Sequence, residues 1–166
     1  MPHASHKLEL LLVPNLPERS LDLGSIGSLF DEWRARGLLD GDGPGKKPNE
    51  ILSGGFVRIW IDSPDRMWLY ANQQGGFRVQ CPACGGHIAR EFNRAFLEWK
   101  TGGVRSVACS HCGVHTDLND CLHRPEAAFA QWAIVFSDVQ SLEINPEVYD
   151  EVEQAVGPMK VIVRRV

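Results

Sequence analysis

Apolar residues in the first quarter of the chain follow two different periods. The run Leu8–Val13 is interrupted only by one glutamate and is closed by Pro14, as expected of a buried strand. A helical period follows, in which four apolar residues fall on one face: Ile26, Leu29, Phe30 and Trp33. We expect Ser25 to cap this helix and Gly37 to end it.

Alternating apolar and polar residues predict extended structure in the middle of the chain. In the stretch 55–62, "GFVRIWID", Val57, Ile59 and Ile61 face one way and their neighbours the other. Segments 67–70 and 77–80 are also predicted as strands. By contrast, residues 40–50, "DGDGPGKKPNE", are Gly, Pro and charge without periodicity, which predicts a flexible loop.

The second half of the chain alternates helices and strands. A helix is predicted from the spacing of five apolar residues: Ile88, Phe92, Ala95, Phe96 and Trp99. The strand 132–139 is followed by a helix that Asn145 caps and Gly157 ends, and 159–166 closes as a strand. This order predicts the α+β class, with helices packed on a single mixed or mostly antiparallel sheet. We expect one domain over residues 1–166.

Composition narrows the class of protein. The 166 residues are 43% apolar and 23% charged, the balance of a globular protein, and the longest apolar run is too short to span a membrane. The start has none of the features of a signal peptide, so the chain is predicted to be cytoplasmic. A net charge of −4 lacks the basic excess typical of nucleic-acid binders.

The strongest chemical signal is a pair of Cys-x-x-Cys motifs, formed by Cys81, Cys84, Cys109 and Cys112. Zn²⁺ takes four thiolates tetrahedrally, and two residues between paired ligands let the backbone turn so that both sulfurs face one centre. A single iron or an iron–sulfur cluster also binds four thiolates, although clusters favour other spacings. A redox dithiol needs only one such pair. The spacing therefore predicts one structural Zn²⁺ in a closed site.

The motifs "CPACGG" and "ACSHCG" resemble the two knuckles of the zinc-ribbon family over residues 77–116. The resemblance implies a zinc-ribbon-like subdomain inserted mid-chain and a bound metal. It implies no particular activity, because ribbons serve many roles. The predicted helix between the pairs departs from the short hairpins of ribbons. More broadly, the order of knuckles, strand, helix and strand resembles certain uncharacterised bacterial cytosolic proteins, some of which are thought to be partners of toxins.

Residues between the second pair and Arg124 offer further candidate chemistry. His115, Cys121 and His123 have a spacing that permits a second metal site. The alternative is that Cys121 is a small buried residue and that the histidines lie at the surface. No sequence motif of a hydrolase or phosphate-binding loop is present, so no catalytic or cofactor-binding residues are assigned.

Charge is most uneven in residues 138–154, which contain six acids and no Lys or Arg. The acids of the predicted C-terminal helix are Glu147, Asp150, Glu151 and Glu153. An ordinary solvated helix face explains them. A docking surface for a basic protein partner also explains them, because complementary charge accelerates association.

Three functional hypotheses follow. The leading one is a non-catalytic zinc protein that acts through protein–protein interaction, with a basic partner that it neutralises or regulates. The second is a nucleic-acid-associated zinc ribbon, which needs a basic stripe: Arg78, Arg90, Arg94, Lys100 and Arg105. The third is an enzyme with a site at His115–His123, including Asp117 and Asp120. The sequence predicts no oligomeric state.

Overall fold

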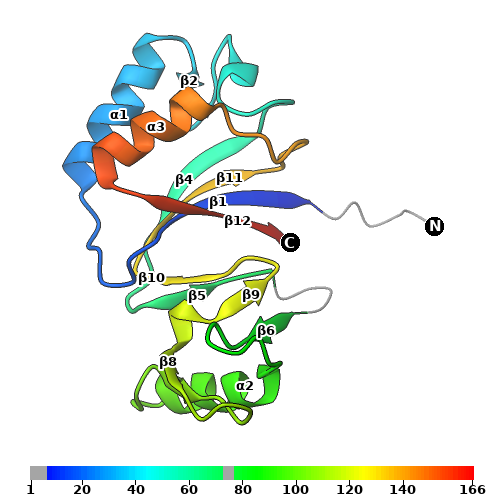
Figure 1. The fold of residues 1–166 in the computed structure, drawn as a ribbon. Helices are drawn as coiled ribbons and strands as arrows, with labels where there is room; N and C mark the ends of the chain where they lie inside the picture. Colours follow the sequence, from blue (N-terminus) through cyan, green and yellow to red (C-terminus); the bar gives the residue numbers. More distant parts are fainter. Residues whose placement is uncertain (1–6, 73–76) are drawn as a thin grey trace. The chain divides into compact units, whose positions relative to one another are not determined.

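The computed structural model describes residues 7–72 and 77–166, and its chain divides into two compact units (Figure 1). The first unit combines Met1–Ala71 with Ala128–Val166, and the second is Asn72–Ala127. The segment 77–116, predicted as a subdomain, lies inside the second unit. No helix within the described ranges has the length and apolarity to cross a membrane.

The first unit is built on a four-stranded antiparallel sheet in the order β12-β1-β11-β4. These strands are β12 (Met159–Arg165), β1 (Leu8–Pro14), β11 (Ala133–Ser137) and β4 (Arg58–Asp62). Leu11 of β1 pairs with Val135 on one side and with Ile162 on the other. The N-terminal strand β1 therefore lies inside the sheet, and the C-terminal strand β12 pairs with it at one edge.

Helices α1 (Leu23–Ala35) and α3 (Pro146–Val156) cover one face of this sheet (Figure 1). Helix α1 begins earlier than predicted, and its cap is the carboxylate of Asp22, which accepts the N–H of Ser25 at 3.0 Å. Ser25 is therefore not the capping residue that was predicted but the residue whose backbone N–H donates to the cap. In α3 the predicted cap is confirmed, because Asn145 accepts the N–H of Glu147 at 3.0 Å.

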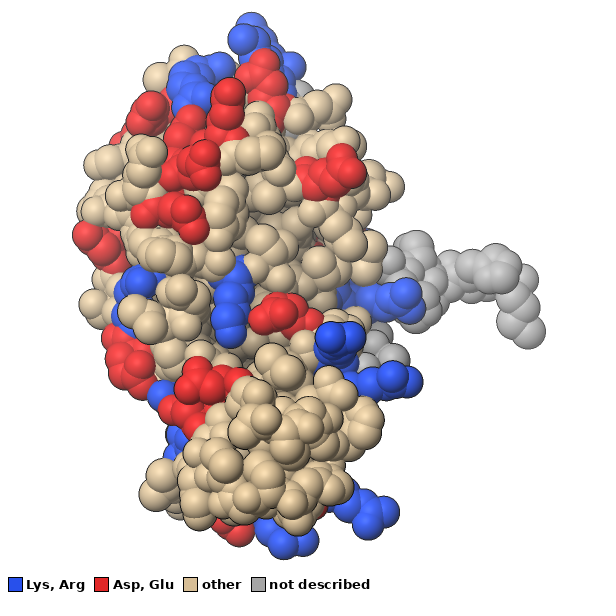
Figure 2. Space-filling view, in the orientation of Figure 1, with Lys and Arg blue, Asp and Glu red and all other residues tan. Residues whose placement is uncertain are grey.

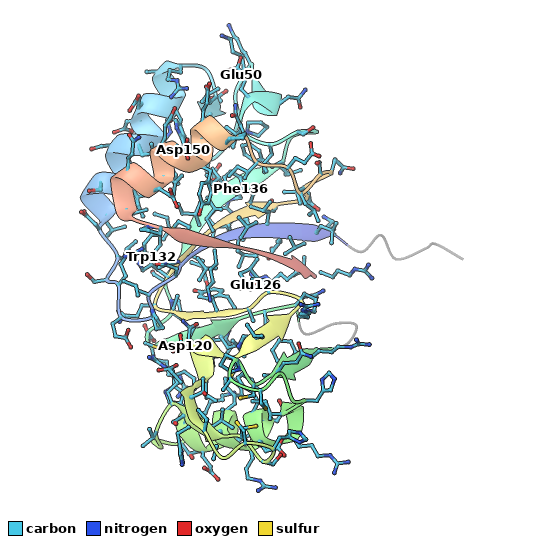
Figure 3. The ribbon with its side chains drawn as sticks, in the orientation of Figure 1. Glu50, Asp120, Glu126, Trp132, Phe136 and Asp150 are labelled. Atoms are coloured by element: carbon cyan, nitrogen blue, oxygen red, sulfur yellow. The ribbon has the colours of Figure 1, made fainter. Side chains whose placement is uncertain are left out.

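Apolar side chains fill both faces of the sheet. The helix side contains the four periodic residues of α1 together with Trp132 and Phe136, which are fully buried (Figure 3). On the other face, a ribbon of β5 (Trp68–Tyr70) and β10 (Ala128–Ala130) packs over Leu11, Val135 and Ile162. Burial on both faces accounts for the continuous apolar run of β1.

The stretch 40–50 contains more secondary structure than the predicted loop. β2 (Leu39–Asp40) and β3 (Gly43–Pro44) form a short hairpin, and a 3₁₀ turn follows at Pro48–Glu50. Gly45 is needed here, because a Cβ at this position would lie 2.2 Å from the carbonyl oxygen of Gly37. The flexibility of residues 40–50 stays a prediction.

The second unit contains α2 and two small antiparallel sheets. Helix α2 (Ala89–Lys100) confirms the helix predicted between the cysteine pairs. The strands are β6 (Arg78–Gln80) with β9 (Leu122–Arg124), and β7 (Ser106–Ala108) with β8 (His115–Asp117), and a 3₁₀ turn spans Leu118–Asp120. The α+β class is confirmed. In place of one sheet, the described strands form one four-stranded and four two-stranded sheets.

Candidate metal centre

Each Cys-x-x-Cys motif lies in a tight turn that directly follows a strand. In the first turn, the N–H of Cys81 donates to the carbonyl of Gly86 at 2.9 Å, and the N–H of Gly85 donates back to the carbonyl of Cys81 at 2.8 Å. The second turn repeats both bonds between Cys109, Val114 and Gly113, at 3.0 and 2.9 Å. The repeated sequence thus produces two knuckles of the same backbone geometry.

Glycine is required in both knuckles by conformation rather than by space. Gly85 and Gly113 have φ angles of 74° and 76°, in the left-handed region that residues with a Cβ disfavour. A Cβ at either position would meet no atom within 4 Å. Each knuckle therefore depends on the glycine that directly follows its second cysteine, Gly85 or Gly113.

The four cysteine sulfurs converge on one point. All four Sγ atoms lie within 4.8 Å of one another, and no other such cluster of ligand atoms occurs among the described residues. The Sγ atoms of Cys81 and Cys112 are 3.8 Å apart, and those of Cys84 and Cys109 are 3.7 Å apart. None of these cysteines forms a disulfide. The four cysteines therefore form a cluster at metal-binding distance.

Backbone N–H groups donate to two of the four sulfurs, whereas burial and the neighbouring sulfurs raise the pKa of Cys84 and of Cys112. The N–H of Gly86 donates to Sγ of Cys84 at 3.4 Å, and the N–H of His111 donates to Sγ of Cys109 at 3.3 Å. Hydrogen bonds from the backbone N–H groups of Cys112 and His111 lower the pKa of Cys109 to about 6, against the opposing effect of burial. Four thiolates this close repel one another strongly, so full ionisation requires a cation.

A histidine that sequence analysis left aside ties the two knuckles together. Nε2 of His111 donates to the carbonyl oxygen of His87 at 3.0 Å, since a carbonyl can only accept. The ring lies against Gly86, where an added Cβ would be 2.5 Å from Cδ2 of His111. This side chain is not among the clustered ligands. In the sequence, this contact is indicated only by Gly86, whose lack of a side chain leaves room for the ring.

The second metal site considered for His115, Cys121 and His123 is not formed by the described residues. His115 is exposed, whereas Cys121 and His123 are buried. Nε2 of His123 donates to the carbonyl of Leu118 at 3.0 Å, and its ring stacks on Phe77 with centroids 5.3 Å apart. Burial raises the pKa of Cys121 to about 12. These residues belong to the core of the second unit.

Four of the five residues of the basic stripe needed for nucleic-acid binding are exposed, and the fifth, Arg105, is not. Arg105 is largely buried and forms an ion pair with Asp117, with Nη2 and Oδ2 3.0 Å apart. Lys100 lies over the ring of Phe96, 5.2 Å from its centroid. Arg78, Arg90 and Arg94 are exposed. The same ion pair engages Asp117, one of the residues considered for an enzyme site.

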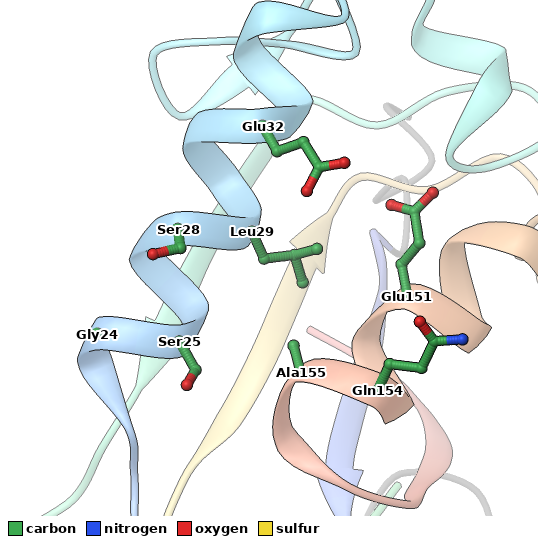
Figure 4. A pocket seen from close by; sticks show the side chains of 8 residues that line it. All are labelled: Gly24, Ser25, Ser28, Leu29, Glu32, Glu151, Gln154 and Ala155. Atoms are coloured by element: carbon green, nitrogen blue, oxygen red, sulfur yellow. The ribbon is translucent and has the colours of Figure 1, made fainter.

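Acidic side chains gather over α1 and α3 of the first unit (Figure 2). Glu147 and Asp150 are exposed, while Glu153 is half-buried. A groove between the two helices is lined by Ser28, Leu29, Gln154 and Ala155, among others, and carries Glu32 on one side and Glu151 on the other (Figure 4). Its carboxylates face Arg36, whose Nη1 lies 3.9 Å from Glu32 and 2.8 Å from Glu151.

Comparison of the chain with protein-family models, with curated proteins and with solved structures finds no match. The likeness to zinc ribbons therefore rests on the spacing of the cysteines and on the geometry of their knuckles.

Proposed function

We propose that Cys81, Cys84, Cys109 and Cys112 hold one structural Zn²⁺ ion. Four thiolates at about 2.3 Å from a tetrahedral Zn²⁺ stand about 3.8 Å from one another. The distances of 3.8 and 3.7 Å between sulfurs of opposite knuckles match this value, and this agreement carries the proposal.

Other uses of four cysteines agree less well with the same distances. Thiolates that bind different irons of a cluster stand farther apart than thiolates around a single ion. A redox dithiol needs only one Cys-x-x-Cys pair, whereas all four sulfurs here lie within 4.8 Å of one another, so the second pair takes part as well. A single iron has the same tetrahedral geometry, so metal analysis distinguishes it from zinc.

The proposed ion stabilises the second unit and performs no catalysis. Four protein ligands leave no open position for a substrate or a water molecule. The described residues of this unit form short strands, one helix and a 3₁₀ turn, and metal binding supplies about 10–16 kcal/mol in small zinc domains. Loss of the ion is therefore expected to unfold this unit.

Elemental analysis of the purified chain tests the proposal. We expect one zinc per chain, and we expect Cys84→Ser and Cys109→Ser to lose it and to unfold the second unit. Cys121→Ser is the matched control, because this buried cysteine lies outside the cluster. Full zinc content and unchanged melting in both ligand variants would refute the tetrathiolate site.

We further propose that the chain acts by binding a basic protein through the acidic surface of α3. Glu147 and Asp150 are exposed there, and the helix contains no Lys or Arg. The net charge of the whole chain, −4, is negative like this surface and also favours a basic partner. Glu151 contributes little to this surface, because Trp33 and Arg36 already engage its carboxylate.

A comparison of charge variants tests this part of the proposal. The double variant Glu147→Lys/Asp150→Lys should lose capture of a basic polypeptide from nuclease-treated lysate. The control, Asp40→Lys/Asp65→Lys, changes charge equally at exposed positions outside α3 and should retain capture. Equal recovery by both variants would contradict the proposed surface. Recovery of nucleic acid that nuclease removes would favour the zinc-ribbon alternative.

A further inference from the structure

The two cysteines of each knuckle differ in exposure to solvent. Cys81 is completely buried and Cys109 has 4% of its surface exposed, whereas Cys84 and Cys112 are exposed. The difference follows from the fold, because the first cysteine directly continues a strand and the second lies in the turn beyond it.

Bound zinc makes this difference chemically important. A metal ligand must be a thiolate, and the thiolate is the form of cysteine that attacks peroxides. With all four sulfurs held in the same ionisation state, access decides which of them reacts first. Cys84 and Cys112 are the exposed residues of the cluster, so peroxide in solvent meets them first.

We propose that Cys84 and Cys112 are sites of oxidation by hydroperoxides, and that their oxidation releases the metal. The inference rests on the proposed zinc site, and it adds that zinc binding there is lost on exposure to peroxide. The second unit then becomes an element whose folding depends on the redox state of its surroundings.

The chemistry proceeds in two balanced steps. The exposed thiolate attacks one peroxide oxygen, an S–O bond forms, the O–O bond breaks, and the departing hydroxide takes a proton to become water. A neighbouring thiolate then attacks the sulfenic sulfur, an S–S bond forms, and a second hydroxide leaves and is protonated. Two thiolates are oxidised, one hydrogen peroxide is reduced, and two protons are consumed.

Each exposed cysteine has a sulfur of the opposite knuckle as a close neighbour for the second step. Cys84 has Sγ of Cys109 at 3.7 Å, and Cys112 has Sγ of Cys81 at 3.8 Å. Disulfide sulfurs are no longer thiolate ligands, so the ion loses two of its four partners with each bond formed. Cys121 is buried outside the cluster and takes no part.

The experiment uses full-length protein whose zinc content has first been measured, so that absence of zinc counts against the proposed function alone. Hydrogen peroxide is added while a zinc-binding dye records release, and a brief pulse of N-ethylmaleimide on untreated protein is mapped by mass spectrometry. We expect roughly tenfold more early adduct on Cys84 and Cys112 than on Cys81 and Cys109. Zinc release should parallel disulfides between knuckles, and dithiothreitol with zinc should reverse it.

Cys121→Ser provides the control, because zinc release in this variant should equal that of the wild type. Zinc that stays bound in peroxide would overturn the inference, as would early adducts on Cys81 or Cys109. Disulfides confined to Cys81–Cys84 and Cys109–Cys112 would overturn the assignment of reacting partners.

Discussion

Nε1 of Trp33 donates a hydrogen bond of 2.7 Å to the carboxylate of Glu151, and so joins helix α1 to helix α3. Arg36 adds a second contact to the same carboxylate at 2.8 Å. Trp33 is completely buried, and without this acceptor its indole N–H would lack a partner in the core. Glu151 is therefore a structural residue of the first unit.

Replacing Glu151 by Ala should destabilise the first unit. The change leaves the buried Trp33 N–H without an acceptor, which costs about 1–3 kcal/mol. Asp150→Ala is the matched control, since this neighbouring acid is exposed and should change stability little. Urea unfolding followed by Trp fluorescence measures both variants, and equal stabilities would show that the contact is unimportant.

The same contact predicts a dependence of stability on pH. Burial opposes ionisation of Glu151, but the hydrogen bonds from Trp33 and Arg36 outweigh it and lower the pKa below its ordinary value of 4.5. A depressed pKa stabilises the folded chain above pH 4.5, and this stability disappears as pH falls through the folded pKa. The loss of stability in acid should therefore be smaller in Glu151→Gln than in the wild type. Parallel acid profiles would contradict this assignment.

Both tyrosines should resist ionisation in the folded protein. Burial and a 2.8 Å hydrogen bond to Asp62 raise the pKa of Tyr70 far above its ordinary value of 10.0, and burial also raises that of Tyr149. The chain has two tyrosines in all. Phenolate absorbance should thus appear only above pH 10, together with unfolding. A normal titration centred near pH 10 with circular dichroism unchanged would contradict the buried environments.

Gly86→Ala should weaken the metal centre through His111. The new Cβ would lie 2.5 Å from the imidazole ring, so the ring must move and its bond to His87 is lost. Overpacking of this kind costs about 1–3 kcal/mol and should speed zinc removal by a chelator. In a His111→Ala background the same glycine change should have a smaller effect, because the clash with the ring is gone and the 3.2 Å approach of the new Cβ to Sγ of Cys84 remains. Additive effects of the two changes would argue against a shared contact.

The sequence pattern correctly predicted which residues are buried where a helical period marks the buried face. The four apolar residues of α1 and the two valines of α3, Val148 and Val152, are buried as their spacing predicts. Val57 is different, because β4 starts only at Arg58 and the valine is 61% exposed. Strand ends depend on pairing with a distant strand, here β11, which local alternation does not specify.

In the candidate site too, features that arise within one turn were predictable from the sequence, whereas contacts between distant residues were not. Spacing predicted the four cysteines, since each pair arises within a single turn. The contact of His111 with His87 joins residues 24 positions apart, and the pairing of Glu151 with Trp33 joins residues 118 positions apart. Neither has a periodic signature, and both arise only when separate elements pack together.

X-ray absorption spectroscopy at the zinc edge of the purified protein tests the central claim most directly. The account predicts a single shell of four sulfurs at about 2.3 Å from zinc, with no nitrogen or oxygen ligand. A mixed shell that includes nitrogen would mean that a histidine such as His111 replaces one of the cysteines. Absence of zinc from protein purified without chelator would contradict the structural metal centre itself.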